Sequence, residues 1–450
     1  MDDKSNSASN GITTAVYLDK VVRALGDRVD QYSLLQVESR ESMLRFANNE
    51  ATTVNYGHTV AVQVYITKGK KKALGVISEL SNDVIISTYI EQLIEAMRLS
   101  KRADVSTLPG GRHRFHVLKD LDAGISNGDM FSMAKQGMDA CLEVGSERAA
   151  GSVMMEDTRF SILTSSGTRA TEERSSAMLS IRAIKNRGSG AAVSISTHLN
   201  GLDPVTAGKT AAINAKKSQD PVKVEPGIYD VLLAPSVSAS LIQLFGSAAS
   251  AFSVEAGLSF LAGKLGKHTA SELFNLVDYG QIKGGIGSRA FDDEGSPTEI
   301  TSIVKDGILT HYLHNSTTAE KANTVSTGNA GIIDPSPWNL VAEGGSEPVD
   351  HIIGSIKKGI LLTNNWYTRF QNYRTGEFST LARDAAFIIS NGEIAQSIHG
   401  SRLSDDLPRL FESIKSISKE RAWIKWWGEV TIPVLAPYLL IKGSRITTPT

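Results

Sequence analysis

Apolar and polar positions in the first half of the chain predict one order of elements that occurs twice. The first set consists of a helix, three β-type segments and a second helix, at 13–26, 31–48, 52–67, 72–78 and about 82–100. Ser81 precedes the second helix and is expected to be its N-cap. These spacings predict one layered unit of helices and strands.

The same order of elements returns about 118 residues later, which indicates an internal repeat. The second set again has a helix, three strands and a helix, at 130–144, 151–165, 168–183, 190–198 and about 204–217. We therefore predict a duplicated α-β-β-β-α unit, with repeats at about 11–102 and 128–218. Its expected product is a layered domain with antiparallel sheets.

The character of the sequence changes after a linker at 218–226, which contains two prolines and three charged residues. Beyond the linker, a buried strand leads into a helix, and Gly/Asp-rich turns then separate many short strands. We predict a disordered tail at 1–10, an N-terminal α/β layered domain at 11–222 and a mainly antiparallel β domain at 223–450. The predicted fold class is α+β.

Composition narrows the possible functions. A chain of 450 residues is long enough for two domains, and its net charge of −1 gives no electrostatic footprint for nucleic acid. The basic run at 68–72 lies between two predicted strands, so we expect a solvated hairpin tip. Cys141 is the only cysteine, which excludes a disulfide or a cysteine-based zinc cluster within the chain. No signal-peptide pattern or membrane-length apolar run occurs, so we expect a cytoplasmic protein without membrane contact.

The segment 364–393 carries the densest chemistry of the chain. Its first part alternates aromatic side chains with Thr, Arg, Gln and Asn, which offers flat apolar faces and fixed donors together. One interpretation is a surface that holds an extended peptide or another subunit. The alternative is an ordinary edge hairpin with a turn at 375–377. The candidate contact residues are Trp366, Tyr367, Arg369, Tyr373, Arg374 and Phe378.

Two long motifs resemble the TldD/PmbA family. The first is N-x-W-Y-T-R-x-Q-x-Y-R-T-G-x-F-S, followed by F-I-I-S-N-G-E-I, within 364–394. The second block, at 287–331, has an acidic turn, a -DGxL- hairpin and a -STGxAG- loop like those of the family. Both blocks occur in the family's order, and weaker likeness extends over nearly the whole chain.

The resemblance implies where metal ligands should be, and this chain lacks them. Active family members carry His-Glu-x-x-x-His on the helix after the VLLAP-like strand, and a cysteine near the C-terminus completes the zinc site. The resemblance places Gln243, Leu244 and Ala248 at the motif positions, and no cysteine follows Cys141. We expect no catalytic residue, metal or cofactor in this chain, with zinc held by a partner subunit instead.

Several other segments are candidates for metal, peptide or subunit binding, and most of them also have a purely structural explanation. His311 and His314 are three apart and would point to opposite faces of a strand. The acidic turn of Asp292, Asp293 and Glu294 is conceivable as a cation site, although such turns more often bond their own backbone. The loop at 326–331 could present backbone amides to a peptide or be a plain glycine turn. Three aromatic residues near the C-terminus are candidate dimer contacts: Trp423, Trp426 and Trp427.

The resemblance and the missing metal ligands together imply a TldE/PmbA-like subunit of a TldD-type zinc metallopeptidase complex. Such a chain would complete a chamber for unfolded or flexible peptides and help to bind them, while being inactive alone. Its expected partners are a TldD-type catalytic subunit in a heterodimer, or a second copy in a homodimer, together with peptide substrates. The alternatives are a homodimeric peptide-binding modulator or chaperone without proteolysis, and an independent metallopeptidase with unrecognised ligands.

Overall fold

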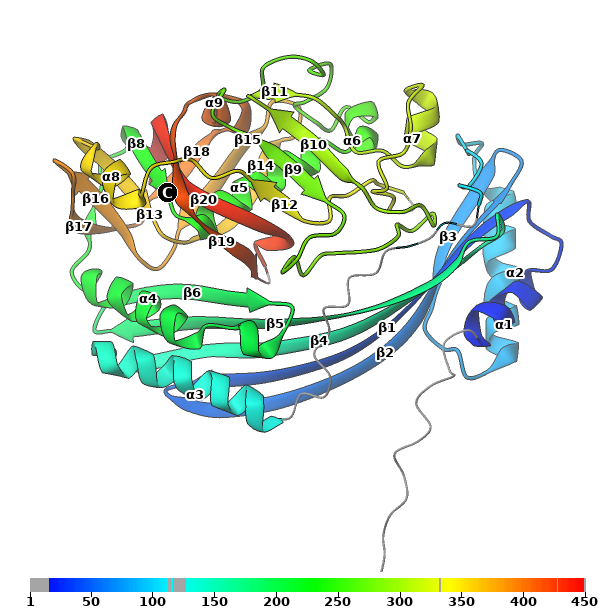
Figure 1. The fold of residues 1–450 in the computed structure, drawn as a ribbon, viewed down its shortest axis with the longest axis horizontal. Helices are drawn as coiled ribbons and strands as arrows, with labels where there is room; N and C mark the ends of the chain where they lie inside the picture. Colours follow the sequence, from blue (N-terminus) through cyan, green and yellow to red (C-terminus); the bar gives the residue numbers. More distant parts are fainter. Residues whose placement is uncertain are drawn as a thin grey trace, which may run out of the picture.

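The computed structural model describes most of the chain, namely residues 16–111, 113, 115, 127–331, 333–426 and 428–448. The tail predicted at 1–10 lies outside these residues. The fold is α+β with largely antiparallel sheets, as the sequence pattern predicts. Figure 1 shows two layers: a long curved sheet below, and a second β-rich body above one part of its concave face. Within the described helices, none is both long and apolar enough to cross a membrane.

The lower layer is a six-stranded antiparallel sheet in the order β3-β2-β1-β4-β5-β6. Its strands are β1 (Gln31–Ala47), β2 (Glu50–Lys68), β3 (Lys71–Ile77), β4 (Arg148–Thr164), β5 (Arg169–Lys185) and β6 (Gly188–Ser196). The basic run at 68–72 forms the β2–β3 hairpin tip, as expected. The two predicted repeats supply three neighbouring strands each and meet where β1 pairs with β4.

The pairing of β1 with β4 exchanges core residues between the repeats. Leu34 lies opposite Leu163, and Leu44 lies opposite Val153. Leu163 packs against the core of the first repeat, whereas Leu44 belongs to the core of the second. Because each central strand contributes to its neighbour's core, the repeats form one continuous sheet rather than two separate units.

Helices close the two ends of this sheet. The helices α1 (Val16–Leu25) and α2 (Asp83–Leu99) lie at one end, whereas α3 (Asn127–Val144) and α4 (Pro204–Lys217) cover the outer face at the other (Figure 1). The N-cap of α2 is Asn82, whose side chain accepts a hydrogen bond from Val84 N at 2.9 Å. The expectation of Ser81 was wrong, because its hydroxyl bonds Glu79 instead.

Strand β5 separates two environments by simple alternation. Its odd-numbered residues from Ala177 to Ala183 are buried beneath α3 and α4. Its even-numbered residues, including Met178 and Arg182, therefore point to the other face, toward the upper layer. The even-numbered residues of β5 therefore form part of the concave face of the sheet.

The upper layer is built on a larger mixed sheet whose main path is β11-β10-β9-β12-β20-β8-β13-β16-β17-β7. Most pairs are antiparallel, but β12–β20, β8–β13 and β7–β17 are parallel. The strands on this path are β7 (Val222–Lys223), β8 (Gly227–Leu233), β9 (Leu276–Tyr279), β10 (Ile300–Lys305), β11 (Ile308–Leu309), β12 (Leu340–Ala342), β13 (Lys358–Leu362), β16 (Ala386–Ser390), β17 (Glu393–His399) and β20 (Val430–Thr447).

Further elements complete the upper layer. Off the main path, β14 pairs with β15, β15 with β18, and both β18 and β19 with β20. These strands are β14 (Asn365–Asn372), β15 (Glu377–Ala382), β18 (Arg402–Asp406) and β19 (Ile414–Trp426). The helices of the upper layer are α5 (Pro235–Ala248), α6 (Ala251–Glu255), α7 (Ser316–Lys321), α8 (Val349–Gly354) and α9 (Leu407–Glu412). In the lower layer, a short 3-10 turn, η1 (Leu199–Gly201), precedes α4. The helix α5 is buried in the core, where Phe245 packs against Phe274 and Phe411.

The predicted acidic turn bonds its own backbone and docks on the lower sheet. Asp292 is buried, and its carboxylate accepts hydrogen bonds from the backbone N–H groups of Glu294, Ser296 and Ala330. The carbonyl of Asp293 accepts a bond of 2.7 Å from the Ser33 hydroxyl on β1. The structural alternative for this turn therefore describes the Asp292 carboxylate, whereas the Asp293 and Glu294 carboxylates accept hydrogen bonds from Gln63 and Ser316.

The loop at 326–331 is held by a second buried carboxylate. Asp278 accepts bonds from Asn329 Nδ2 at 2.6 Å and from the backbone N–H groups of Trp338 and Asn339 at 2.8 and 3.0 Å. The Ala330 N–H of the same loop donates to Asp292. Burial raises the pKa of Asp278 to about 7, although these hydrogen bonds oppose the shift. This loop is thus tied down by internal contacts at Asn329 and Ala330.

The buried carboxyl of Asp278 predicts a pH dependence of stability. The folded protein binds its proton more tightly than the unfolded chain, whose ordinary pKa is 3.8. The stabilisation is complete below that value and is lost as the pH rises to about 7. Asp278→Asn should therefore reduce the fall in unfolding free energy over this range, by up to about 1.4 kcal/mol per pH unit.

The measurement is denaturant unfolding at a series of pH values. Asp306→Asn is the matched control, since Asp306 is exposed in the turn between β10 and β11 and is hydrated in both states. Identical pH slopes for wild type and Asp278→Asn would contradict the prediction.

Candidate functional site

Two ion pairs join strand β5 of the lower sheet to the upper layer. Near one end, Arg182 on β5 binds Asp384 with Nε to Oδ1 at 2.7 Å and Nη2 to Oδ2 at 3.1 Å. Further along the same strand, Glu172 accepts Arg289 Nε at 2.6 Å and the Ala290 N–H at 2.7 Å. Ten residues of an extended strand separate these two positions, which corresponds to about 33 Å.

The Glu172–Arg289 pair is almost fully removed from water. Each side chain is only 5% exposed. The Arg289 guanidinium lies 3.9 Å from the centre of the Phe160 ring and 5.3 Å from that of Trp338. A buried pair of this kind is tolerated because hydrogen bonds and aromatic faces replace lost hydration. It fixes the upper layer firmly against β5.

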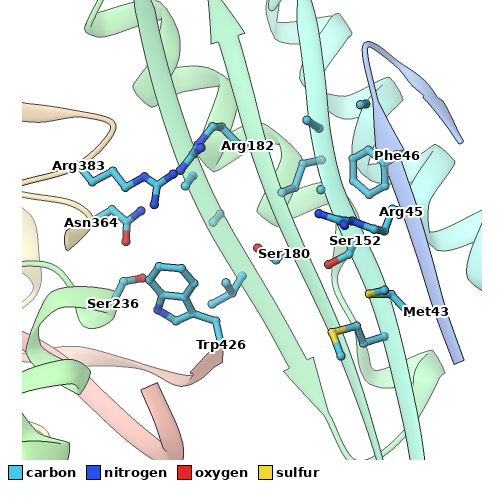
Figure 2. Close-up of a pocket in the computed structure, with 18 of the residues that line it drawn as sticks. Met43, Arg45, Phe46, Ser152, Ser180, Arg182, Ser236, Asn364, Arg383 and Trp426 are labelled. Carbon is cyan, nitrogen blue, oxygen red and sulfur yellow. The ribbon is translucent and has the colours of Figure 1, made fainter. Parts of the chain in front are cut away.

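A cavity of about 740 Å³ opens between the layers next to Arg182. The lower sheet contributes Met43, Arg45 and Phe46 from β1, Ser152 and Met154 from β4, and Ser180 and Arg182 from β5. The upper layer contributes Ser236 at the start of α5, Asn364, Trp366, Arg383 and Trp426. We call this cavity the arginine cleft (Figure 2).

The arginine cleft is positively charged although the whole chain is nearly neutral. Arg45, Arg182 and Arg383 line it, and no Asp or Glu is among its described lining residues. Figure 2 shows Arg182 and Arg383 reaching toward one another from opposite walls, beside Asn364. Burial, and secondly the positive charge of Arg182, lower the pKa of Arg383. The cleft therefore favours a ligand that carries negative charge.

A second cavity continues the first beyond Trp426. Its volume is about 250 Å³, and it shares Met154 and Trp426 with the arginine cleft. Its apolar lining residues are Met154, Met155, Met178, Ile286, Trp426 and Val430, and we call it the methionine pocket. Its charged lining residues, Glu41, Glu156 and Lys425, include both signs. Together the cavities form a charged compartment followed by an apolar one.

The hairpin of β14 and β15 supplies part of the cleft wall, and Glu429 fixes its shape. The Glu429 carboxylate, 1% exposed, accepts the N–H groups of Tyr367 at 2.7 Å and Thr368 at 2.9 Å. This contact holds a bulge in β14 in which Tyr367 has a φ of 56°. A bulky residue at positive φ is strained unless its surroundings enforce it. Glu429 thereby sets the position of Trp366 in the cleft.

The six predicted contact residues of this hairpin do not form one surface. Trp366 lines the cleft, whereas Tyr367 and Tyr373 are exposed. Phe378 is 1% exposed and belongs to the upper core, so its predicted contact role was wrong. Phe378 points into the core from β15, whereas Glu377 before it is exposed.

The two hairpin arginines contact backbone carbonyls, and Arg369 also lies near a buried acid. Arg369 lies 3.6 Å from Glu429 and donates to the Thr368 carbonyl at 2.7 Å. Arg374 donates to the Gly257 carbonyl at 3.0 Å. The hairpin turn expected at 375–377 is present, with Gly376 at a φ of 78°.

The motif positions on α5 have structural roles. Gln243 Oε1 accepts the N–H groups of Thr431 at 2.6 Å and Ile432 at 2.8 Å, while its Nε2 donates to the Glu429 carbonyl at 3.1 Å. Leu244 packs against the upper core, and Ala248 is part of it. These side chains do not fit a zinc ion, because the amide is fully engaged and the other two offer no lone pair.

The tryptophan cluster is less exposed than its sequence suggests. Trp426 is 8% exposed and lies 5.6 Å from Trp366 between ring centres. The expectation of an exposed contact was therefore wrong for Trp426. Trp423 is half-buried, and Trp427 lies outside the described residues. A dimer contact at Trp423 or Trp427 stays a prediction.

The histidines singled out by sequence do not share a site of metal-binding type. His314 is 7% exposed and bonds Thr318 Oγ1 at 3.1 Å, whereas His311 is exposed and bonds the Ser302 carbonyl. Burial lowers the pKa of His314. In the parts of the chain that the structure describes, no three His, Cys, Asp or Glu side chains gather as a possible metal site.

Sequence reasoning missed the residues that define the cleft: Arg45, Arg182, Arg383, Asp384 and Glu429. One signal was available, because Arg383 and Asp384 interrupt the apolar run between β15 and β16. The positive φ of Asp384, 61°, belongs to this interruption. The other residues lie more than 150 positions from Arg383 or in an unremarkable turn, so only folding brings them together.

The clamp made by Glu429 predicts a stability effect. In Glu429→Gln, an amide N–H₂ would face one of the two backbone N–H donors, and the charge-assisted bonds would be lost. We expect a fall in the free energy of unfolding of about 1.5–3 kcal/mol, measured by denaturant titration. Glu412→Gln is the control, since Glu412 is exposed at the end of α9. Equal stability of the two variants would count against the clamp.

Comparison with known proteins places this architecture. Residues 226–448 match the family model described as PmbA/TldA metallopeptidase C-terminal domain. A metalloprotease of Synechocystis sp. is 28% identical over 233 residues, which are 50% of this chain and 49% of that protein. Metalloprotease PmbA of Escherichia coli O157:H7 is 27% identical over 217 residues, 48% of this chain and 47% of the relative. The chain thus matches about half the length of each of these relatives.

A solved structure extends the likeness of fold to nearly the whole chain. TldE from Thermococcus kodakarensis superposes with a TM-score of 0.83 at 20% identity, covering 96% of this chain and 100% of that one. At this identity the likeness concerns the fold alone. The family match rests on the C-terminal half, where the two sequence motifs also lie. On this ground the chain belongs to the PmbA/TldD family.

Proposed function

We propose that this chain is a TldE/PmbA-like, non-catalytic subunit that binds flexible peptides for a TldD-type zinc metallopeptidase. The observation that carries the proposal is the contrast between the cavities and the neighbouring helix α5. A charged-to-apolar cavity lies between the layers, yet the family's metal-motif positions on α5 hold Gln243, Leu244 and Ala248. The chain offers a place to bind and no recognised means to cut.

The cavities suit an extended peptide. Polar groups on β5 alternate with buried residues, so Arg182, Ser180 and Met178 face the cavities in sequence. Trp366 and Trp426 supply flat apolar faces from the opposite wall. Such a mixture binds backbone and side chains without demanding one sequence.

The partner is proposed to supply the zinc, the water-activating Glu and hence the hydrolysis. The relatives that are named metalloproteases match this chain over only about half of their own length. In this chain, Gln243 ties α5 to β20 and holds the backbone of Glu429, which in turn shapes β14. The residue at a motif position therefore supports the binding wall.

The decisive experiment compares peptide cleavage by this chain, by a TldD-type partner from the same source, and by their mixture. We expect no hydrolysis by this chain alone, no stoichiometric zinc in it, and greater hydrolysis by the mixture than by the partner. Chelator-sensitive hydrolysis by this chain alone would overturn the proposal. Peptide binding by a homodimer that no TldD-type partner joins would favour the modulator or chaperone alternative.

A cleft-filling substitution tests the binding surface. Ser180→Phe should weaken binding of a flexible, unstructured peptide by about tenfold or more, since the ring would occupy space between the layers. Ser132→Phe, on an exposed position of α3, is the matched control and should bind like wild type. Binding is measured by titration calorimetry, with thermal unfolding as a check on folding. Unchanged binding in Ser180→Phe would place the peptide elsewhere.

A further inference from the structure

The arginine cleft contains more positive charge than its walls neutralise. Asp384 forms an ion pair with Arg182 and accepts three hydrogen bonds, from Arg182 Nη2 at 3.1 Å, Ser189 at 3.0 Å and Asn364 at 2.8 Å. Its carboxylate is thus fully used. Within the described part of the chain, neither Arg45 nor Arg383 forms an ion pair, and the described cleft lining has no carboxylate. Asp384 and Glu429 act on Arg383 only through their charge, from outside the lining.

Of these two arginines, Arg383 is the better placed to bind an anionic group in the cleft. Its guanidinium lies 4.4 Å from the centre of the Trp366 ring, and its backbone N–H donates to the Asn364 carbonyl at 3.1 Å. Contact with a ring face leaves the edge of a guanidinium available for hydrogen bonds. Figure 2 shows this side chain directed into the space between the layers. A planar edge with two parallel N–H donors matches a carboxylate.

The methionine pocket has no excess of positive charge among its described lining residues. Its Lys425 is accompanied by Glu41 and Glu156, and its remaining lining is mainly apolar. Arg182 and Met178 are four residues apart on β5, which is about 13 Å of extended strand. A peptide with the same rise would therefore place groups about four residues apart at the two subsites.

The arginine end of the cleft suits the end of a chain. There the Arg182–Asp384 ion pair and the Ser189–Asp384 hydrogen bond connect the sheet with the upper layer. A continuing peptide would meet these contacts, whereas a terminal carboxylate can stop in front of them. An internal acidic side chain would require the backbone to turn away at this point.

We propose that Arg383 binds the terminal carboxylate of a peptide whose apolar side chain, about four residues earlier, occupies the methionine pocket. The proposal rests on the proposed peptide-binding function and adds a direction to it. The peptide lies with its C-terminus beside Arg182 and Asp384, and its N-terminal part leads past Trp426. The recognised feature is a free C-terminus, not a particular sequence.

The test uses acetyl-Leu-Ala-Ala-Ser-Ala as the free acid and as the C-terminal amide, titrated into the full chain by calorimetry. We expect the free acid to bind about tenfold more tightly, because charge-assisted hydrogen bonds exceed neutral ones by about 1 kcal/mol or more. Arg383→Gln should abolish this difference while retaining the affinity for the amide. Arg383→Lys should restore only part of it, since an ammonium lacks the planar edge.

Arg187→Gln is the matched control, because Arg187 is exposed in the turn between β5 and β6 and lies outside the cleft lining. It should keep the full preference for the free acid. Retained affinity of Arg383→Gln for the amide also shows that the cleft has folded.

The other outcomes separate the two proposals. Equal binding of acid and amide would overturn the carboxylate site and leave peptide binding intact. Binding of neither peptide, nor of longer unstructured peptides, would overturn the proposed function itself. An amidated peptide ending in Glu that binds as tightly as the free acid would overturn the requirement for a terminus. Displacement of the free acid by inorganic phosphate at lower concentrations than by acetate would assign the site to phosphate instead.

Discussion

The buried ion pair between Glu172 and Arg289 determines how the two layers sit against one another. Its cost is the removal of two charges from water, and the surrounding contacts reduce that cost. The Ala290 N–H donates to the free carboxylate oxygen, and the Phe160 ring faces the guanidinium. Leu35, Ile162 and Phe291 surround the junction with apolar surface. With the layers fixed here and at Asp384, the intervening length of β5 can remain open.

Charged side chains have two different roles in this interface: some fix loops, and others line the cavity. Asp292 and Asp278 have their carboxylate oxygens occupied by backbone or amide donors, which fixes loops rather than ligands. Glu429 does the same for the β14 bulge. In the cleft the balance is reversed, because Arg383 projects into a cavity whose described lining offers it no acid. Carboxylates with occupied oxygens therefore build the wall, whereas Arg383 faces the cavity without an ion-pair partner among the described residues.

Gln243 connects the family relationship to the proposed division of labour. A metal ligand must point its lone pairs into the site, but the Gln243 amide bonds three groups at the start of β20. Through Glu429 this contact reaches Tyr367 and Thr368, next to the cleft residue Trp366. Gln243 thus supports the wall of the arginine cleft through hydrogen bonds, as the proposed non-catalytic function requires of this helix.

The sequence alone determined the elements and their duplication. Local spacing identified the three strands of each repeat and all four flanking helices, because amphipathic periodicity depends on near neighbours. Turn chemistry identified the β14–β15 hairpin at Gly376. Local patterns were less reliable for single residues. Ser81 was predicted as the cap of α2 in place of Asn82. Phe378 was predicted as a surface contact, although it faces the core. The boundaries of the two domains stay a prediction.

Only the tertiary structure decided where the cleft lies and which charges it contains. Arg45, Arg182 and Arg383 belong to three strands or loops far apart in the chain, and nothing in the local patterns of Arg45 and Arg182 distinguishes them from solvated surface arginines. Whether an arginine is neutralised depends on the position of a carboxylate such as Asp384, which is set by the packing of the two layers. Periodicity reports which face of an element is apolar. It cannot report what stands opposite the polar face, because that is a property of long-range packing.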